Sequence, residues 1–176
     1  MRNKIHNILL EATAFKDRPN INDAFWEWFG NSPLRDSEGN PITYYHGTIE
    51  EFSSFSAIPE VEIGFPVYYF TSQPEYADVY TGMDSLRNDG KIGGTLLPVY
   101  INCKNIFDTR KEKHKEIYMN EMYKLGYKGS EIKDHLENNF SNNELPWWDN
   151  WLSYKVAHKN NFDGIFLQER EIFDSI

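Results

Sequence analysis

The stretch Ile42-Thr43-Tyr44-Tyr45-His46-Gly47-Thr48 organises the interpretation of the whole chain. Its β-branched and aromatic residues are typical of a β-strand. The strand delivers His46 and Gly47 to the point where strand pairing is expected to stop. A ligand can bind at such a point, so these two residues are candidate binding residues.

A second stretch, Val67-Tyr68-Tyr69-Phe70-Thr71, has the composition of another short strand. The next four residues, Ser72-Gln73-Pro74-Glu75, combine a capping residue with a proline and predict the start of a helix. That helix would carry Tyr76, Ala77 and Tyr80 on one face. Together the two stretches predict a slot lined by a histidine, a glycine backbone and two tyrosines.

These motifs resemble the ADP-ribosyltransferase superfamily, specifically the His-Tyr-Glu branch that includes diphtheria toxin and the poly-ADP-ribose polymerases. The matching motifs are YHGT at residues 45–48, YYFTS at 68–72 and PEYADVY at 74–80. A closer resemblance is to the transferase domains of phage and prophage polyvalent proteins, whose pattern is matched by FWEWFGNSPLRDSEGNPITYYHGTIEEFSSF at residues 25–55. The resemblance covers residues 25–80, is thin over 105–160 and returns at 162–165.

The resemblance implies NAD as the co-substrate and assigns a role to each matching residue. His46 would hydrogen-bond a ribose hydroxyl of the adenosine half, and the backbone N–H and C=O of Gly47 would bind the nicotinamide carboxamide. Tyr69 and Tyr80 would enclose the nicotinamide ring. These residue types fit the roles, because imidazole bonds at both ends, glycine permits close approach and tyrosine offers stacking area. The expected NAD-binding set also includes Thr48, Phe70 and Thr71.

A carboxylate is implied as well, because cleavage of the bond between nicotinamide and ribose passes through an oxocarbenium-like transition state. Glu171 is the predicted carboxylate, since it opens the strand-like EIFDSI. With Glu169 it is similar to the Glu-x-Glu of arginine-specific relatives, in which the first acid steers the acceptor and the second stabilises the ribosyl cation. The predicted catalytic set is therefore His46, Tyr69, Glu169 and Glu171.

Another interpretation of QERE at residues 168–171 is an exposed charged turn. The phage relatives usually continue into a further strand. The expectation for this end of the chain is therefore either a shortened ending or a truncated chain.

Size and composition predict a folded protein. The chain has 176 residues, of which 40% are hydrophobic and 16% aromatic, which is enough for one domain with a core. We expect a single α+β domain over 1–176, with a helical segment over 1–30 and a core over 42–176 that contains a helical insertion over about 112–158. As the resemblance implies, the fold would be two small, mainly antiparallel sheets with flanking helices.

Aromatic clusters outside the slot are interpreted first as core. The rings of Phe25, Trp26, Trp28 and Phe29 are expected to pack against the sheet. In the segment after residue 111 the expected buried side comprises Ile117, Met119, Met122, Tyr123 and Leu125, with a break at 126–129. Trp147, Trp148, Trp151 and Tyr154 lie at helical spacing, which favours a core stripe; the alternative is a recognition surface for a protein target.

Charge and cysteine content limit the partners and the compartment. The formal net charge is −9, from 27 acidic and 18 basic residues, which disfavours a nucleic-acid target. The single cysteine, Cys103, is expected to be a buried small hydrophobe in a reducing compartment. No signal peptide or membrane span is predicted, so the expected location is the cytoplasm, or the host cytoplasm for a phage-encoded chain. The histidines show no metal-ligand spacing, and no metal is expected.

The predicted function is NAD-dependent mono-ADP-ribosylation of a side chain on an unidentified target protein. One alternative is a non-catalytic ADP-ribosyltransferase-like binding or virion-associated protein. Another is an RNA 2'-phosphotransferase-like enzyme, which would need basic residues for RNA phosphate that this acidic chain has few of. A glycosidase using Glu169 or Glu171 lacks a placed partner carboxylate.

Overall fold

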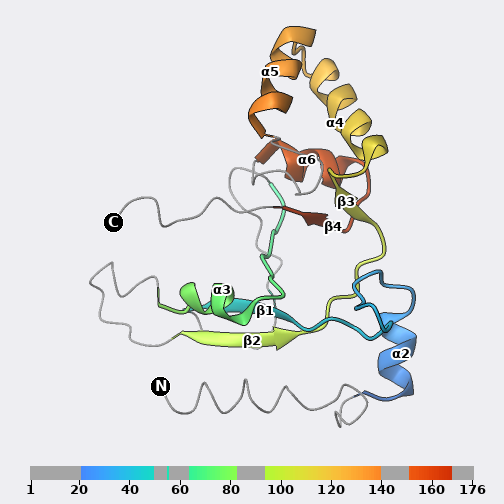
Figure 1. Ribbon diagram of the computed structural model, residues 1–176, viewed down its shortest axis with the longest axis vertical. Coiled ribbons are helices and arrows are strands. Elements are labelled where there is room, and N and C mark those ends of the chain that lie inside the picture. The colour runs from blue at the N-terminus through green and yellow to red at the C-terminus, as the bar shows by residue number, and fades with distance from the viewer. Residues whose placement is uncertain (1–20, 50–54, 56–63, 83–93, 140–150, 168–176) are drawn as a thin grey trace. The chain divides into compact units, whose positions relative to one another are not determined.

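The computed structural model describes residues 21–49, 55, 64–82, 94–139 and 151–167, and its elements are shown in Figure 1. The chain divides into two compact units. The first contains residues 1–53 and 69–102, and the second contains 54–68 and 103–176. The predicted helix at the N-terminus, Glu169 and Glu171 lie outside the described residues.

The first unit begins with helix α2 (Asp23–Phe29), which starts and ends where the local sequence predicts. The Asn22 side chain accepts a hydrogen bond from the Phe25 N–H (3.0 Å) and caps the helix. Gly30 closes it with a positive φ of 51°, a conformation that glycine adopts without steric cost.

The prediction that all four rings of this helix are core is wrong. Phe29 is fully buried, whereas Trp26 and Trp28 are 40% and 50% exposed. Phe25 stacks on Phe29 one turn away, with ring centroids 5.6 Å apart. A short helix can bury only one side, and positions one residue away from Phe29 and Phe25 point elsewhere.

Strand β1 (Tyr44–Thr48) pairs antiparallel with β2 (Thr95–Val99). On its other edge, Tyr45 exchanges two backbone hydrogen bonds with Thr71, of 2.8 and 3.1 Å. The strand predicted over 67–71 is therefore reduced to one bridge at Thr71. Pro98 lies opposite Tyr45, whose backbone groups point at Thr71 and away from β2. This position of the ladder therefore needs no N–H from β2, and a proline is tolerated there.

The second unit contains strands β3 (Ile106–Asp108) and β4 (Gly164–Phe166) and helices α4 (Glu112–Lys124), α5 (Gly129–Asn139) and α6 (Trp151–Lys159). The two strands pair in parallel. Helix α4 contacts α5 and α6, and α6 contacts β4 (Figure 1). With an antiparallel sheet in the first unit and a parallel one in the second, the described helices and two small sheets form the expected α+β fold.

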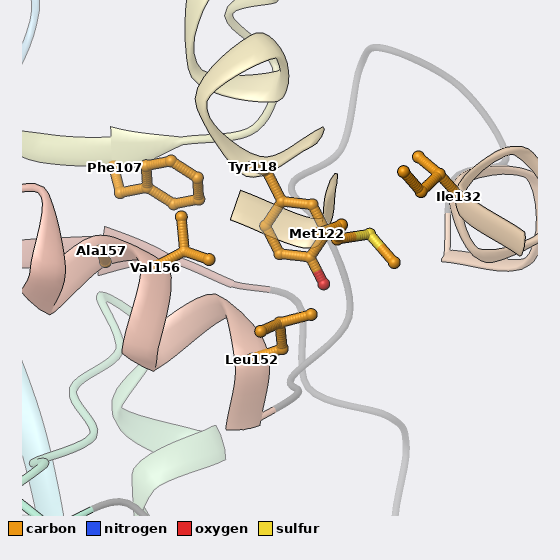
Figure 2. Close-up of a cluster of buried hydrophobic side chains, with 7 residues drawn as sticks. All are labelled: Phe107, Tyr118, Met122, Ile132, Leu152, Val156 and Ala157. Carbon is orange, nitrogen blue, oxygen red and sulfur yellow. The ribbon is translucent and has the colours of Figure 1, made fainter. Parts of the chain in front are cut away.

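A buried hydrophobic cluster joins these helices to β3, and Figure 2 shows its side chains converging from separate elements. Its members are Phe107, Tyr118, Met122, Ile132, Leu152, Val156 and Ala157. The expected break between helices is confirmed, because α4 ends before Gly126, which has a φ of 93°. Tyr123 and Leu125, expected on the buried side of α4, are 52% and 58% exposed, and Tyr118 is buried in their place. The predicted buried side is therefore confirmed for Met122 and wrong for Tyr123 and Leu125, while Ile117 and Met119 are partly buried against the cluster.

Asp163 ties the start of β4 to residues 103–105. Its carboxylate accepts hydrogen bonds from the Cys103 thiol (3.0 Å) and from the backbone N–H groups of Lys104 and Asn105, both 2.8 Å away. Cys103 is buried, as predicted, and burial together with the Asp163 carboxylate raises its pKa to about 12. The thiol therefore has a structural environment rather than that of a nucleophile.

Glu121 is a buried carboxylate that links α4 to α6. It accepts hydrogen bonds from Lys124 on its own helix (2.7 Å) and from Lys159 on α6. These two ammonium groups hold its pKa below the ordinary 4.5. Only 6% of its side chain is exposed, against 63% for Lys124 and 61% for Lys159, so solvent weakens the pairs.

Glu121→Gln should lower the free energy of unfolding by about 1 kcal/mol at neutral pH, because hydrogen bonds to a charged group are lost. The unfolded carboxylate takes up its proton at a higher pH than the folded one. The stabilisation is therefore present above the ordinary pKa and disappears as the pH falls through the folded pKa. Urea unfolding at neutral and acidic pH tests this, and an equal loss at both would contradict it.

None of the helices in the described part of the chain is long and apolar enough to span a membrane.

Candidate active site

The candidate site lies in the first unit, where β1 meets the segment before α3 (Pro74–Val79). The Nδ1 atom of His46 is 2.8 Å from the backbone carbonyl oxygen of Tyr69. A carbonyl oxygen only accepts, so Nδ1 carries the proton in this hydrogen bond. In the neutral ring Nε2 is then the acceptor nitrogen. An imidazole held in this way presents an acceptor of the kind that a ribose hydroxyl needs.

Phe70 holds the imidazole from a second direction. The ring centroids of His46 and Phe70 are 5.5 Å apart, and the rings are tilted by 49°. This is ordinary packing distance for an aromatic pair. The orientation of His46 is therefore set by two consecutive residues, the Tyr69 carbonyl and the Phe70 ring.

The backbone of Gly47 faces the same edge of β1 as that of Tyr45. Backbone groups alternate between the two edges of an antiparallel strand, and those of Tyr45 point at Thr71 rather than at β2. Among the described residues, the Tyr45–Thr71 bridge is the last backbone pairing on this edge. Two residues before Thr71, the Tyr69 carbonyl bonds the His46 side chain. On the opposite edge, pairing with β2 continues through Gly47 and Thr48, so the prediction that strand pairing stops at Gly47 is wrong there.

Gly47 is also required by the packing of β1 on α3. A Cβ placed on Gly47 would lie 1.8 Å from the carbonyl oxygen of Ala77 and 3.1 Å from the Cβ of Tyr80. Real atoms do not approach backbone so closely. The absence of a side chain thus allows α3 to lie directly on the strand, and it brings Tyr80 beside Gly47.

The two predicted ring-bearing tyrosines have different environments. Tyr80 follows the last residue of α3 and is half-buried, with its ring centroid 6.1 Å from that of Tyr76. Ala77 is the buried residue of the same helix, so the predicted helix face is confirmed. The Tyr69 side chain is 49% exposed, while its carbonyl contacts His46.

The structure therefore collects His46, Gly47, Phe70, the Tyr69 backbone and Tyr80 around the end of β1. Thr48 and Thr71 lie in the same backbone framework, since Thr48 is opposite Thr95 in the ladder. The positions of Glu169 and Glu171 stay predictions from the sequence. The described residues contain no cluster of three or more His, Cys, Asp or Glu side chains that would hold a metal ion.

Sequence reasoning missed the part played by Gly94. Its N–H donates to the Thr81 carbonyl (2.9 Å), and an added Cβ would lie 2.2 Å from the Thr48 carbonyl oxygen. Gly94 therefore lets the start of β2 pass close to both β1 and the end of α3. The sequence signal was a glycine immediately before a strand, which marks close backbone approach as well as mobility.

Comparison with known families bears on the chain as a whole. A family model described as "ADP-Ribosyltransferase in polyvalent proteins" matches residues 36–175. Comparison with curated proteins and with solved structures finds no match. The matched range contains the whole of the site around the end of β1 and most of the chain. The protein therefore belongs to the ADP-ribosyltransferase family found in polyvalent proteins.

Proposed function

We propose that this protein transfers a single ADP-ribose from NAD to a side chain of a target protein. The observation that carries the proposal is the hydrogen bond between His46 Nδ1 and the Tyr69 carbonyl, made one residue before Gly47 on β1. This arrangement supplies an oriented acceptor nitrogen next to a glycine backbone. The nitrogen can accept a hydrogen bond from a ribose hydroxyl, and the glycine N–H and C=O can bind a carboxamide.

In the proposed reaction the bond between nicotinamide and the ribose C1' breaks, and its electron pair leaves with nicotinamide. The acceptor side chain then forms a bond to C1' and loses its proton. His46 Nε2 accepts a hydrogen bond from a ribose hydroxyl, and the Gly47 N–H and C=O bind the carboxamide. Tyr69 and Tyr80 flank the nicotinamide ring. No metal takes part in this proposal.

The carboxylates act on the charge that develops in the transition state. Glu171 stabilises the ribosyl cation, and Glu169 orients the acceptor side chain. Interactions that strengthen only in the transition state raise turnover rather than affinity, so these two roles can be separated from NAD binding. The proposed place of action is the cytoplasm, and for a phage-encoded chain the cytoplasm of the host.

The function is tested by incubating the protein with NAD and a bacterial lysate, followed by mass spectrometry of modified peptides. The expected result is a mass increase of one ADP-ribose on specific side chains, absent when His46→Ala replaces the native protein. NAD binding without any modified peptide would favour the non-catalytic alternative. The absence of both NAD binding and modification would contradict the proposal.

His46→Ala should weaken NAD binding by about tenfold, because one hydrogen bond to the ribose is lost and the site is no longer oriented. Isothermal titration of NAD into the two proteins measures this difference. Phe70 and the Tyr69 carbonyl remain in place, so thermal unfolding should change little. Unchanged NAD affinity in a folded His46→Ala protein would move the site elsewhere.

Tyr80→Ala should weaken nicotinamide binding by about 1 kcal/mol beyond the loss of buried area, whereas Tyr80→Phe should be mild. The contact with Gly47 is made by the Tyr80 Cβ, which both variants keep, so β1 should still pack on α3. Tyr76→Ala, one turn earlier on α3, is the matched control. Equal large losses in the Ala and Phe variants would indicate a hydroxyl hydrogen bond instead of a ring stack.

A further inference from the structure

Helix α6 has a buried side and an exposed side. The buried side contributes Leu152, Ser153, Tyr154, Val156 and Ala157. The exposed side carries Trp151, Lys155, His158 and Lys159, which we call the α6 strip. Residues three and four apart lie on the same side of a helix, so these four side chains form one continuous surface.

The α6 strip combines cations with aromatic rings in fixed contact. Trp151 is 49% exposed, and the Lys155 Nζ lies 4.7 Å from the centre of its ring. The His158 ring stacks on Phe65 of the same unit, with centroids 4.1 Å apart and planes 9° apart. These contacts order the side chains without burying them, which lowers the entropic cost of binding a partner.

The charge of the α6 strip is opposite to that of the chain. The nine residues of α6 include no aspartate or glutamate, although the formal net charge of the protein is −9. Lys159 contacts the carboxylate of Glu121, which is buried and is shared with Lys124. Both lysines are mostly exposed and share a single buried carboxylate, which leaves an excess of positive charge at the surface. Lys155 adds a third cation.

We propose that the α6 strip is the docking surface for an acidic segment of the target protein. This inference rests on the proposed function, because the segment would belong to the protein that receives ADP-ribose. Exposed tryptophan is typical of the residues that dominate protein interfaces, and surrounding cations attract carboxylates and speed association. The Trp151 ring would supply the apolar contact and Lys155 and Lys159 the complementary charge, to which Lys124 of α4 adds through the shared Glu121.

An acidic polypeptide fits this surface better than a nucleic acid. The strip is one face of a nine-residue helix, so it offers a short positive surface. A long polyanion would extend beyond it and meet the field of a chain with a net charge of −9. A short acidic segment needs to meet only the strip.

The test uses the full chain and a fluorescently labelled oligoglutamate peptide, with binding followed by fluorescence anisotropy at low salt and without NAD. Lys155→Glu should weaken peptide binding by about tenfold, and Trp151→Ala by about fivefold. Lys133→Glu on α5 is the matched control, since it makes the same charge change at a 73% exposed lysine of another helix. This control should change binding by less than about twofold. Circular dichroism checks that each variant folds.

A loss confined to Lys155→Glu and Trp151→Ala supports the proposal. An equal loss in Lys133→Glu would overturn it, because peptide binding would then depend only on overall charge. No loss in either strip variant would also overturn it, because the peptide would then bind elsewhere. A single-stranded oligonucleotide that binds more tightly than the peptide, and is lost in the same variants, would also overturn it. The peptide-binding assay contains no NAD and does not depend on ADP-ribose transfer. Failure of docking can therefore be distinguished from failure of the proposed transferase activity.

Discussion

Glu171→Gln is expected to lower the turnover of ADP-ribose transfer by roughly a hundredfold or more while leaving NAD affinity nearly unchanged. Glutamine is close to glutamate in size but has no negative charge. If Glu171 has the proposed role, the change removes stabilisation of the ribosyl cation and keeps the contacts made in the ground state. Single-turnover measurement of nicotinamide release, together with NAD titration, separates the two quantities.

Glu169→Gln is the matched comparison, because the two acids are separated by one residue. It should affect NAD cleavage less than Glu171→Gln does and should affect transfer to the acceptor more. If both variants kept native turnover, the exposed charged turn would be the better interpretation of residues 168–171. A loss of NAD affinity as large as the loss of turnover would show that the acid acts in binding rather than in the transition state.

Gly47→Ala is expected to destabilise the first unit by about 3 kcal/mol or more, and to abolish NAD binding with it. The added Cβ would lie 1.8 Å from the carbonyl oxygen of Ala77, which belongs to the backbone of α3 and cannot rotate away. The helix or the strand must move, and movement of either separates Tyr80 from Gly47. Urea unfolding followed by circular dichroism measures the loss.

Gly82→Ala is the control for this change, because among the described residues an added Cβ there would meet only the Val79 carbonyl oxygen, at 3.9 Å. It should leave stability nearly unchanged. If Gly47→Ala also folded with native stability but lost NAD affinity, Gly47 would be needed at the ligand and not for packing. Native stability with native affinity would contradict both roles of Gly47.

The variants at Gly47 and Glu171 distinguish a residue needed for the fold of the site from a residue needed for the chemical step. Gly47 acts through the fold, so its replacement should change unfolding and binding together. Glu171 is proposed to act through charge in the transition state, so its replacement should change turnover alone. These opposite patterns would be hard to produce if the site lay elsewhere in the chain.

Several features could be predicted from the sequence because they depend on residues within one or two turns. Asn22 and Gly30 mark the ends of α2 through hydrogen bonds and a backbone conformation that they form locally. Pro74 begins α3 for the same kind of reason. The strand that carries His46 also follows from its immediate neighbours, although His46 lies in the middle of β1 and not at its end. The catalytic glutamate stays a prediction from sequence similarity.

The tertiary structure alone decided which side of each element is buried and what each glycine does. Phe29 is core and Trp28 is not, although both are large rings in one short helix, because only one side of that helix has a partner. Gly47 was predicted for ligand approach, and its closest neighbour is the backbone of α3. Local sequence determines where an element begins and ends, whereas burial and close approach depend on segments distant in the chain that come to lie against it.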